Sequence, residues 1–309
     1  MTGALQGFAV IGVIIAIGYG VGRLGLVSAR AVNDLSRLVM FVMIPCLLVT
    51  MLLEADIGQL FSSLLVVSLL AAVLTIGCYL LVAGWLWKRD APETIIGSFA
   101  ASFANTGNIG IPVSMYVLGS AAYAAPVLVL QAAVFTPLAL VALDIATADA
   151  ARSSRRVIAQ AMVNPVLIAT VVGVTVAALG IPVPKFVVDP FRLVGEAAVP
   201  IMLLTFGMSL SGQRPLAPGT GRRDVILATA LKLAFMPVAA WVLGRFVFAM
   251  EPKQLLAVTV LAALPTAQNV LAIAQRHQRG EILAGDTALV TTLGSIPVLL
   301  TVTLLLSGT

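Results

Sequence analysis

Charged residues are scarce in this sequence. Only 10% of its 309 residues are Asp, Glu, Lys or Arg, whereas 60% are apolar, and the mean hydropathy is +1.09. An ordinary soluble domain carries about 25% charged residues, because its surface must face water. The composition therefore predicts a polytopic membrane protein and excludes secreted, fibrous and disordered classes. The net charge of +5 fits the Lys and Arg of cytoplasmic loops, so no nucleic-acid partner is expected.

Side chains for metal and redox chemistry are also few. The chain has two cysteines, Cys46 and Cys78, both inside apolar runs, and one histidine, His277, near the end of an apolar run. Two cysteines and one histidine indicate no disulfide framework, no metal site and no cofactor. We expect His277 to be a residue of the membrane interface. No H-E-x-x-H motif, no mid-span pair of acids and no Ser beside a His occurs, so the sequence predicts no catalytic residues and no enzyme.

Ten apolar runs are long enough to cross about 30 Å of hydrocarbon as helices. The expected spans are 4–22, 33–53, 60–87, 94–118, 122–145, 161–179, 191–211, 223–249, 254–278 and 282–306. The first run follows no charged segment, so we expect a retained span and not a signal peptide. Thirteen of the 18 Lys and Arg residues lie in alternate connections. The positive-inside rule places these connections in the cytoplasm and both termini outside, in a multi-pass protein of the plasma membrane.

Four sequence matches indicate an internal repeat. The clearest joins I-P-C-L-L-V-T at 44–50 with V-P-I-M-L-L-T at 199–205, and Pro112 and Pro265 are spaced similarly. We therefore expect a first five-helix repeat at 1–145, a short cytoplasmic linker at 146–160 and a second repeat at 161–309. Because five is an odd number, the second repeat must insert in the opposite direction. Inverted repeats of this kind are typical of secondary transporters.

Two of the expected spans contain helix-breaking residues at mid-membrane. The fourth span carries N-T-G-N-I-G-I-P at 105–112, and the ninth carries A-L-P-T-A-Q-N at 263–269. Proline lacks an N–H, so the freed backbone groups must face protein or a watery cavity. The N-terminal end of a half-helix suits a carboxylate, and amide side chains add donors. The candidate substrate-binding residues are Asn105, Thr106, Gly107, Asn108, Gly110, Pro112, Pro265, Thr266, Gln268 and Asn269.

The alternative interpretation of both breaks is purely structural, as kinks whose amides bond between packed helices. Two breaks at repeat-related spans favour a binding site over that alternative. Pro45 and Pro200 also lie mid-span, but they have few polar neighbours in sequence, so we expect them to act as kinks or hinges.

Lys232 is the only cation well inside an apolar run. An ionisable residue at this depth is costly and is a functional candidate by default. It could pair with an anionic substrate, or supply a fixed charge where other transporters bind sodium; alternatively, it could extend to the cytoplasmic interface. The thirteen Asp and Glu residues all lie in loops or near span ends, which disfavours a cation/proton antiporter with a mid-membrane carboxylate.

The motifs N-T-G-N-I-G-I-P-V at 105–113, A-A-V-P-I-M-L-L-T-F-G-M-S-L at 197–210 and L-P-T-A-Q-N-V-L-A-I-A at 264–274 resemble those of the auxin efflux carrier family of permeases. That family includes bacterial relatives linked to malate and malonate. The resemblance covers essentially the whole chain and implies crossing of helices 4 and 9, a scaffold with a transport bundle, and a homodimer. It also implies that Asn105, Pro112, Pro265 and their neighbours form the site.

The sequence thus predicts an all-α protein of ten transmembrane helices that transports a small organic anion by an elevator-type, alternating-access mechanism. The expected substrate is a mono- or dicarboxylate, with auxin-like acids included. Three alternatives remain open: a sodium- or proton-coupled symporter of the bile-acid-symporter type, a gated anion channel, and a sensor that does not transport.

Overall fold

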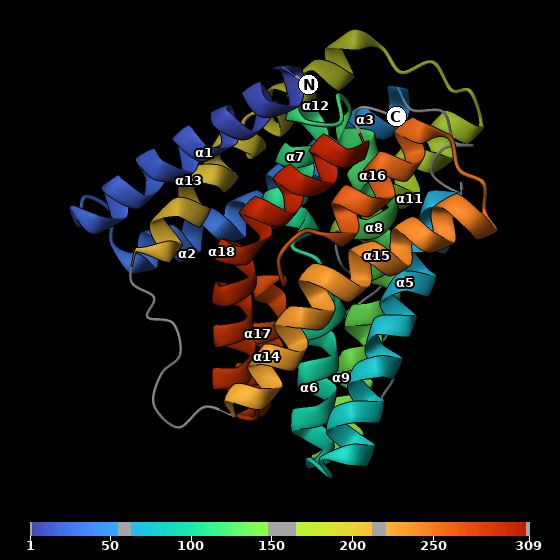
Figure 1. The fold of residues 1–309 in the computed structure, drawn as a ribbon. Helices are drawn as coiled ribbons and strands as arrows, with labels where there is room; N and C mark the ends of the chain where they lie inside the picture. The colour runs from blue at the N-terminus through green and yellow to red at the C-terminus, as the bar shows by residue number, and fades with distance from the viewer. Residues whose placement is uncertain (1, 55–62, 148–164, 212–220, 307–309) are drawn as a thin grey trace. The chain divides into compact units, whose positions relative to one another are not determined.

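The computed structural model describes residues 2–54, 63–147, 165–211 and 221–306 (Figure 1). Almost all of these residues are helical, and no strand forms among them. A single isolated β-bridge within the described ranges joins Ala104 and Thr266. The prediction of an all-α protein is therefore confirmed.

Seven helical stretches in the described residues are long and apolar enough to cross a membrane. They are Gln6–Arg23, Ala29–Leu53, Ser63–Leu86, Ala121–Ala146, Lys185–Leu210, Arg222–Val247 and Glu281–Leu306. The polytopic class is thus confirmed. Of the other expected spans, 94–118 and 254–278 are interrupted, and 161–179 begins outside the described residues. The ten-helix inverted repeat stays a prediction, and most of the linker at 146–160 also lies outside the described residues.

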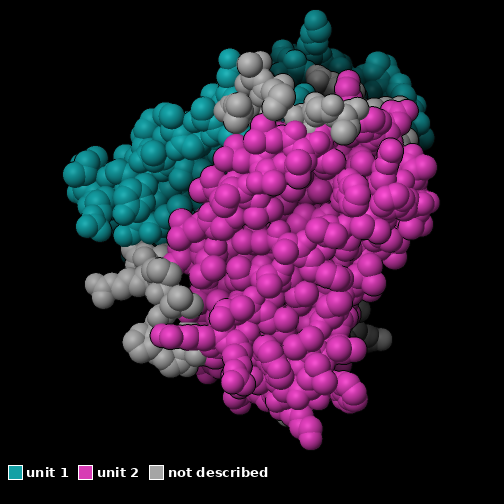
Figure 2. Space-filling view, viewed as in Figure 1, with its two compact units in different colours: residues 1–62, 107–132, 162–213 teal, residues 63–106, 133–161, 214–309 magenta. Residues whose placement is uncertain are grey.

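The chain forms two compact units, coloured separately in Figure 2. Unit 1 comprises Met1–Ser62, Gly107–Ala132 and Met162–Gln213. Its α-helices are α1 (Thr2–Arg23), α2 (Ala29–Leu38), α3 (Ile44–Glu54), α7 (Ile111–Tyr116), α8 (Ala125–Leu130), α11 (Pro165–Ala178), α12 (Lys185–Glu196) and α13 (Ala198–Leu210). A π-helical turn, Val39–Met43, joins α2 to α3, and a 3₁₀ turn, Ala121–Ala124, precedes α8.

Close packing of small residues joins α1 to α13 in unit 1. A Cβ atom added at Gly18 would overlap the carbonyl of Leu204, and one added at Gly207 would overlap the carbonyl of Ile15. Gly18 and Gly22 are four residues apart, the spacing that lets two helix backbones approach inside a membrane. These glycines therefore set the separation of the two helices.

Unit 2 comprises Ser63–Thr106, Ala133–Ala161 and Arg214–Thr309. Its α-helices are α5 (Ser63–Tyr79), α6 (Ala91–Ser102), α9 (Thr136–Ala146), α14 (Arg222–Ala230), α15 (Met236–Val242), α16 (Pro252–Ala262), α17 (Gln268–His277) and α18 (Glu281–Leu306). Three π-helical turns, Leu80–Leu86, Leu231–Phe235 and Leu243–Val247, extend or join these helices. Two more, Thr106–Gly110 and Gln131–Phe135, contain the boundaries between the units.

Each unit takes segments from both predicted repeats. Unit 1 uses residues 1–62 and 107–132 of the first repeat and 162–213 of the second. Unit 2 uses most of the remainder of each repeat. This division places the two broken spans differently: the ninth lies wholly in unit 2, whereas the fourth is divided between Thr106 and Gly107.

Candidate functional site

Helix α6 ends at the first break because Phe103 leaves the helical conformation. Its backbone is extended, with φ −77° and ψ 111°, and its N–H makes the last helical bond, to the carbonyl of Phe99 at 2.8 Å. The Phe103 ring is buried, with its centroid 5.7 Å from that of Phe99 and 6.0 Å from that of Phe135. This aromatic cluster anchors the point where the helix stops.

The second break separates α16 from α17. Helix α16 ends at Ala262, helix α17 begins at Gln268, and Ala267 between them is extended, with φ −69° and ψ 138°. Pro265 has no N–H to continue a helical ladder. The predicted interruption of the ninth span therefore occurs at the proline.

Backbone hydrogen bonds join the two breaks inside unit 2. The Asn105 N–H donates to the Pro265 carbonyl at 2.8 Å, and the Ala267 N–H donates to the Phe103 carbonyl at 2.9 Å. Together they frame the antiparallel bridge between Ala104 and Thr266. Backbone groups that a broken helix leaves unpaired are costly in hydrocarbon, and here each break supplies partners for the other.

Thr266 holds this crossing to its surroundings. Its hydroxyl donates to the Ala100 carbonyl at 2.6 Å, and its N–H donates to Oγ1 of Thr291 on α18 at 3.0 Å. Thr266 is fully buried. The hydroxyl and the N–H of Thr266 therefore both have protein partners, and these hydrogen bonds stabilise the break.

The candidate residues are divided between the units. Unit 2 contains Asn105, Thr106, Pro265, Thr266, Gln268, Asn269 and Lys232, while unit 1 contains Gly107, Asn108, Gly110 and Pro112. In unit 2, Asn269 is exposed and Gln268 is partly exposed; both lie in the first turn of α17. In unit 1, Gly107 and Asn108 are partly exposed, whereas Gly110 and Pro112 are buried.

The two expected hinge prolines lie at different kinds of position. Pro45 is the second residue of α3, directly after the π-helical turn Val39–Met43. Pro200 is the third residue of α13, which follows α12 after an interruption at Ala197. At Pro200 the missing N–H costs little, because the first N–H groups of a helix have no intrahelical acceptor. Pro45 instead lies inside the continuous helical stretch Ala29–Leu53, next to a π-helical turn. The role of both prolines as hinges stays a prediction.

Lys232 does not extend to the surface. It lies in the π-helical turn Leu231–Phe235 and is 0% exposed. Its ammonium donates to the carbonyl of Ala262 at 2.6 Å and contacts the sulfur of Met236 at 3.4 Å. Ala262 is the last residue of α16, where the helix dipole is negative. The ammonium therefore caps the half-helix that ends at the second break, and the interface alternative does not hold.

Sequence analysis does not find a buried pair formed by His277 and Asp144. His277 Nε2 lies 2.9 Å from Asp144 Oδ1, and Nδ1 lies 2.9 Å from the Ile273 carbonyl oxygen. The His277 ring is 2% exposed, so it is enclosed by protein, and its place at the membrane interface stays a prediction. The two partners are 133 positions apart, and no spacing rule connects them.

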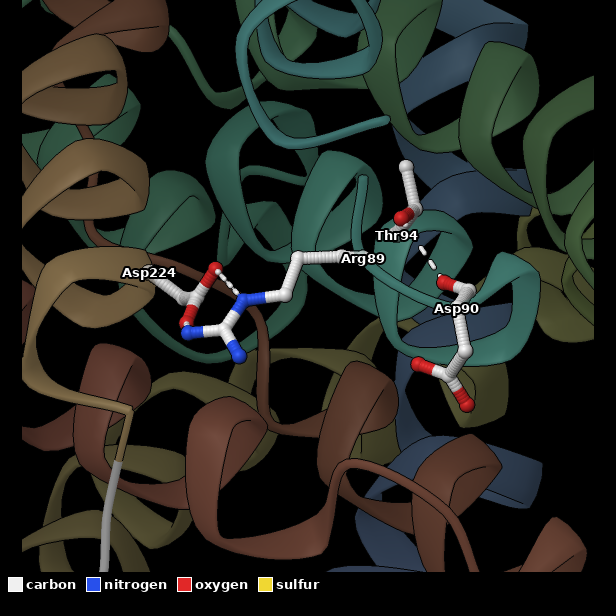
Figure 3. A network of polar contacts seen from close by, with 4 residues as sticks. All are labelled: Arg89, Asp90, Thr94 and Asp224. Atoms are coloured by element: carbon white, nitrogen blue, oxygen red, sulfur yellow. Dashed lines mark hydrogen bonds and ion pairs between the residues drawn. The ribbon is translucent and has the colours of Figure 1, made fainter. Parts of the chain in front are cut away.

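A second pair missed by sequence analysis joins Arg89 to Asp224 (Figure 3). The guanidinium binds both carboxylate oxygens, at 3.2 and 2.6 Å, and the Thr94 hydroxyl nearby donates to the Asp90 carbonyl at 2.8 Å. The pair connects the segment between α5 and α6 to the first turn of α14. Beside it, partial burial and then the Asp90 carboxylate raise the pKa of Glu93 above its ordinary value.

Comparisons with known proteins agree with one another. Residues 5–303 match the family described as "Membrane transport protein". A protein of Rhizobium meliloti (strain 1021) named "Putative malonate transporter" is 25% identical over 293 residues, which cover 92% of this chain and 89% of the relative. An "Uncharacterized transporter" of Methanothermobacter thermautotrophicus is 26% identical over 234 residues, or 74% of each chain.

Proposed function

Because this chain belongs to the membrane transport protein family, the auxin efflux carrier family that its motifs resemble, we propose that it transports a small carboxylate as a secondary transporter. Malonate is the first substrate to test, because a relative that aligns over most of both chains carries that substrate in its name. Malonate is a dicarboxylate and falls within the substrate class that the sequence predicts.

The observation that carries this proposal is the pairing of the two breaks through Asn105 and Pro265. It brings together the C-terminal ends of α6 and α16 and the N-terminal end of α17. A helix N-terminus favours a carboxylate through its N–H groups and its partial positive charge. Gln268 and Asn269 stand in that first turn and have exposed surface, and we propose that their amides add donors to a bound carboxylate.

Lys232 is proposed to support this site without contacting the substrate, from its position at the C-terminal end of α16. Two helix C-termini meet at the crossing, and their carbonyls would otherwise favour a cation. The Lys232 ammonium already bonds the last carbonyl of α16. A fixed cation at that point supports anion binding at the neighbouring N-terminus and replaces a bound sodium ion. We therefore propose transport without a sodium requirement.

The wider architecture is proposed on the family resemblance. Ten spans form two inverted repeats, with unit 1 as the scaffold and unit 2 as the transport bundle that exposes its site alternately to the two sides. Gly107, Asn108, Gly110 and Pro112, which the motif resemblance assigns to the site, belong to unit 1. The protein is proposed to be a homodimer of the plasma membrane with both termini outside.

Uptake of labelled malonate into proteoliposomes tests this function. We expect saturable uptake, faster exchange when malonate is present inside, and no requirement for a sodium gradient. Conductance far above carrier turnover would favour a gated channel, and strict dependence on sodium would favour a symporter of the bile-acid type. Absence of binding and transport for every mono- and dicarboxylate tested would contradict the proposal.

A further inference from the structure

The pair formed by His277 and Asp144 connects two helices of unit 2. His277 is the last residue of α17, and Asp144 lies near the end of α9. Helix α17 packs against α18, α6 and α9 (Figure 1). Both side chains are almost fully enclosed, at 2% and 8% exposed. In the part of the chain that the structure describes, these side chains have no other hydrogen-bond or ion-pair partner.

One arrangement of hydrogens turns both polar contacts of the ring into hydrogen bonds. In the tautomer with hydrogen on Nδ1, the ring donates to the Ile273 carbonyl oxygen at 2.9 Å, which can only accept. Nε2 lies 2.9 Å from a carboxyl oxygen, and a lone pair facing a carboxylate at that distance is repulsive. In this arrangement a second hydrogen lies between Nε2 and Oδ1, either as imidazolium with carboxylate or as neutral imidazole with carboxylic acid. Both forms have zero net charge, and loss of this proton leaves a buried negative charge and breaks one hydrogen bond.

We propose that His277 and Asp144 bind the proton that is coupled to transport. The inference rests on the proposed function and adds a coupling ion to it. Helix α17 is ten residues long and carries Gln268 and Asn269 at one end and His277 at the other. A helix of that length spans about 15 Å and behaves as one rigid element. Proton loss weakens the attachment of α17 to α9 and leaves a negative charge in the bundle, and both effects disfavour an anion at the other end of α17.

Other titratable and charged groups stand on the elements that pack against this pair. Glu93 is on α6, Glu281 and Asp286 are on α18, and Arg276 precedes His277 on α17 itself. In the described residues, none of them forms a hydrogen bond or an ion pair with the ring or the Asp144 carboxylate. A titration attributed to the pair must therefore disappear when Asp144 alone is neutralised.

The single histidine permits a direct observation of this proton. Because the chain contains one histidine, protein labelled with ¹⁵N-histidine gives the ring signals of His277 only. Solid-state NMR of the full chain in proteoliposomes, without substrate, should show Nδ1 protonated and a second proton shared with Asp144. In Asp144→Asn, the asparagine amide can donate to Nε2, so the ring should carry hydrogen on Nδ1 alone. A wild-type ring that is neutral with hydrogen on Nε2 throughout would overturn the proton site.

Malonate affinity at several pH values tests the coupling. Linkage requires that a proton that strengthens anion binding is itself bound more tightly when the anion is present. We expect wild-type affinity to fall about 5-fold or more as the pair loses its proton, the usual scale of coupling between sites. Asp144→Asn should remove this dependence, whereas Asp34→Asn, the same change at an exposed position of unit 1, should keep it. Equal pH dependence in all three proteins would overturn the coupling. Absence of malonate binding at every pH would reject the proposed substrate and the coupling, while the NMR spectra still decide the proton site.

Discussion

The Asn105 N–H and the Pro265 carbonyl oxygen are 2.8 Å apart, so the broken fourth and ninth spans are bonded to each other at their breaks. A break that only kinked a helix would need water or a side chain to satisfy its backbone. Here each break supplies backbone hydrogen-bond partners for the other, so these N–H and carbonyl groups are not left unpaired where the helices end.

Thr266→Val should destabilise the protein by about 1–2 kcal/mol, because the Ala100 carbonyl loses a buried hydrogen-bond donor. Valine keeps the branched shape of threonine, so packing is retained. Thr301→Val is a matched control, since its hydroxyl bonds the Pro297 carbonyl at an exposed position. Thermal unfolding in detergent should separate the two variants, and equal stabilities would argue against a supporting role for Thr266.

Gly18→Ala should lower the stability of unit 1 by roughly 1–3 kcal/mol, because the new methyl group overlaps the Leu204 carbonyl on α13. Gly12 lies on the same helix with nothing near its Cβ position. Gly12→Ala should therefore be neutral or stabilising by up to about 1 kcal/mol, as alanine favours a helix more than glycine does. A Gly18→Ala protein as stable as Gly12→Ala would contradict the close approach of α1 and α13.

Labelling of introduced cysteines checks the orientation. In a background with Cys46→Ala and Cys78→Ala, Arg222→Cys should react with an impermeant thiol reagent only from the cytoplasm. Thr2→Cys and Thr309→Cys should react only from outside, because the Lys and Arg residues gather in connections on the opposite side. The reverse pattern would overturn the charge argument.

Lys232→Met should weaken malonate binding about 10-fold or more, since the fixed cation behind the site is removed and each 1.4 kcal/mol corresponds to a factor of ten. Lys232→Gln separates charge from hydrogen bonding, because its amide keeps a donor for the Ala262 carbonyl but carries no charge. Affinity measured by calorimetry should fall in both variants. Wild-type affinity in Lys232→Gln would show that only the hydrogen bond matters.

Sequence reasoning locates the breaks because proline, glycine and amides are conspicuous inside apolar runs. It also identifies Lys232, since an isolated cation in such a run is costly to insert and is therefore a candidate for a specific role. The hydrogen-bond and ion-pair partners of such residues cannot be located in the same way. Ala262 contributes only a backbone carbonyl, which leaves no trace in the residue type. His277 and Asp144, like Arg89 and Asp224, are joined by folding across more than 130 positions.

The π-helical turns next to α-helices were not predicted either, because a single additional residue in a helical turn produces no periodic signal over so short a stretch. The division of the fourth span between Thr106 and Gly107 likewise depends on which helices pack together. Composition and local pattern therefore specify the class and the interruptions, while long-range packing determines which side chains meet.

The central claim, that a carboxylate binds at the N-terminal end of α17, is tested most directly by the malonate affinity of Asn269→Asp. This change is nearly isosteric, and an acidic residue in the first turn of a helix is favourable by about 0.3–1 kcal/mol, so the protein should fold with unchanged or higher stability. The new charge stands where the substrate carboxylate is expected. We predict that malonate binding falls at least about 10-fold, equivalent to 1.4 kcal/mol, while thermal stability is kept. A dissociation constant equal to that of the wild type, in a stable Asn269→Asp protein, would contradict the account.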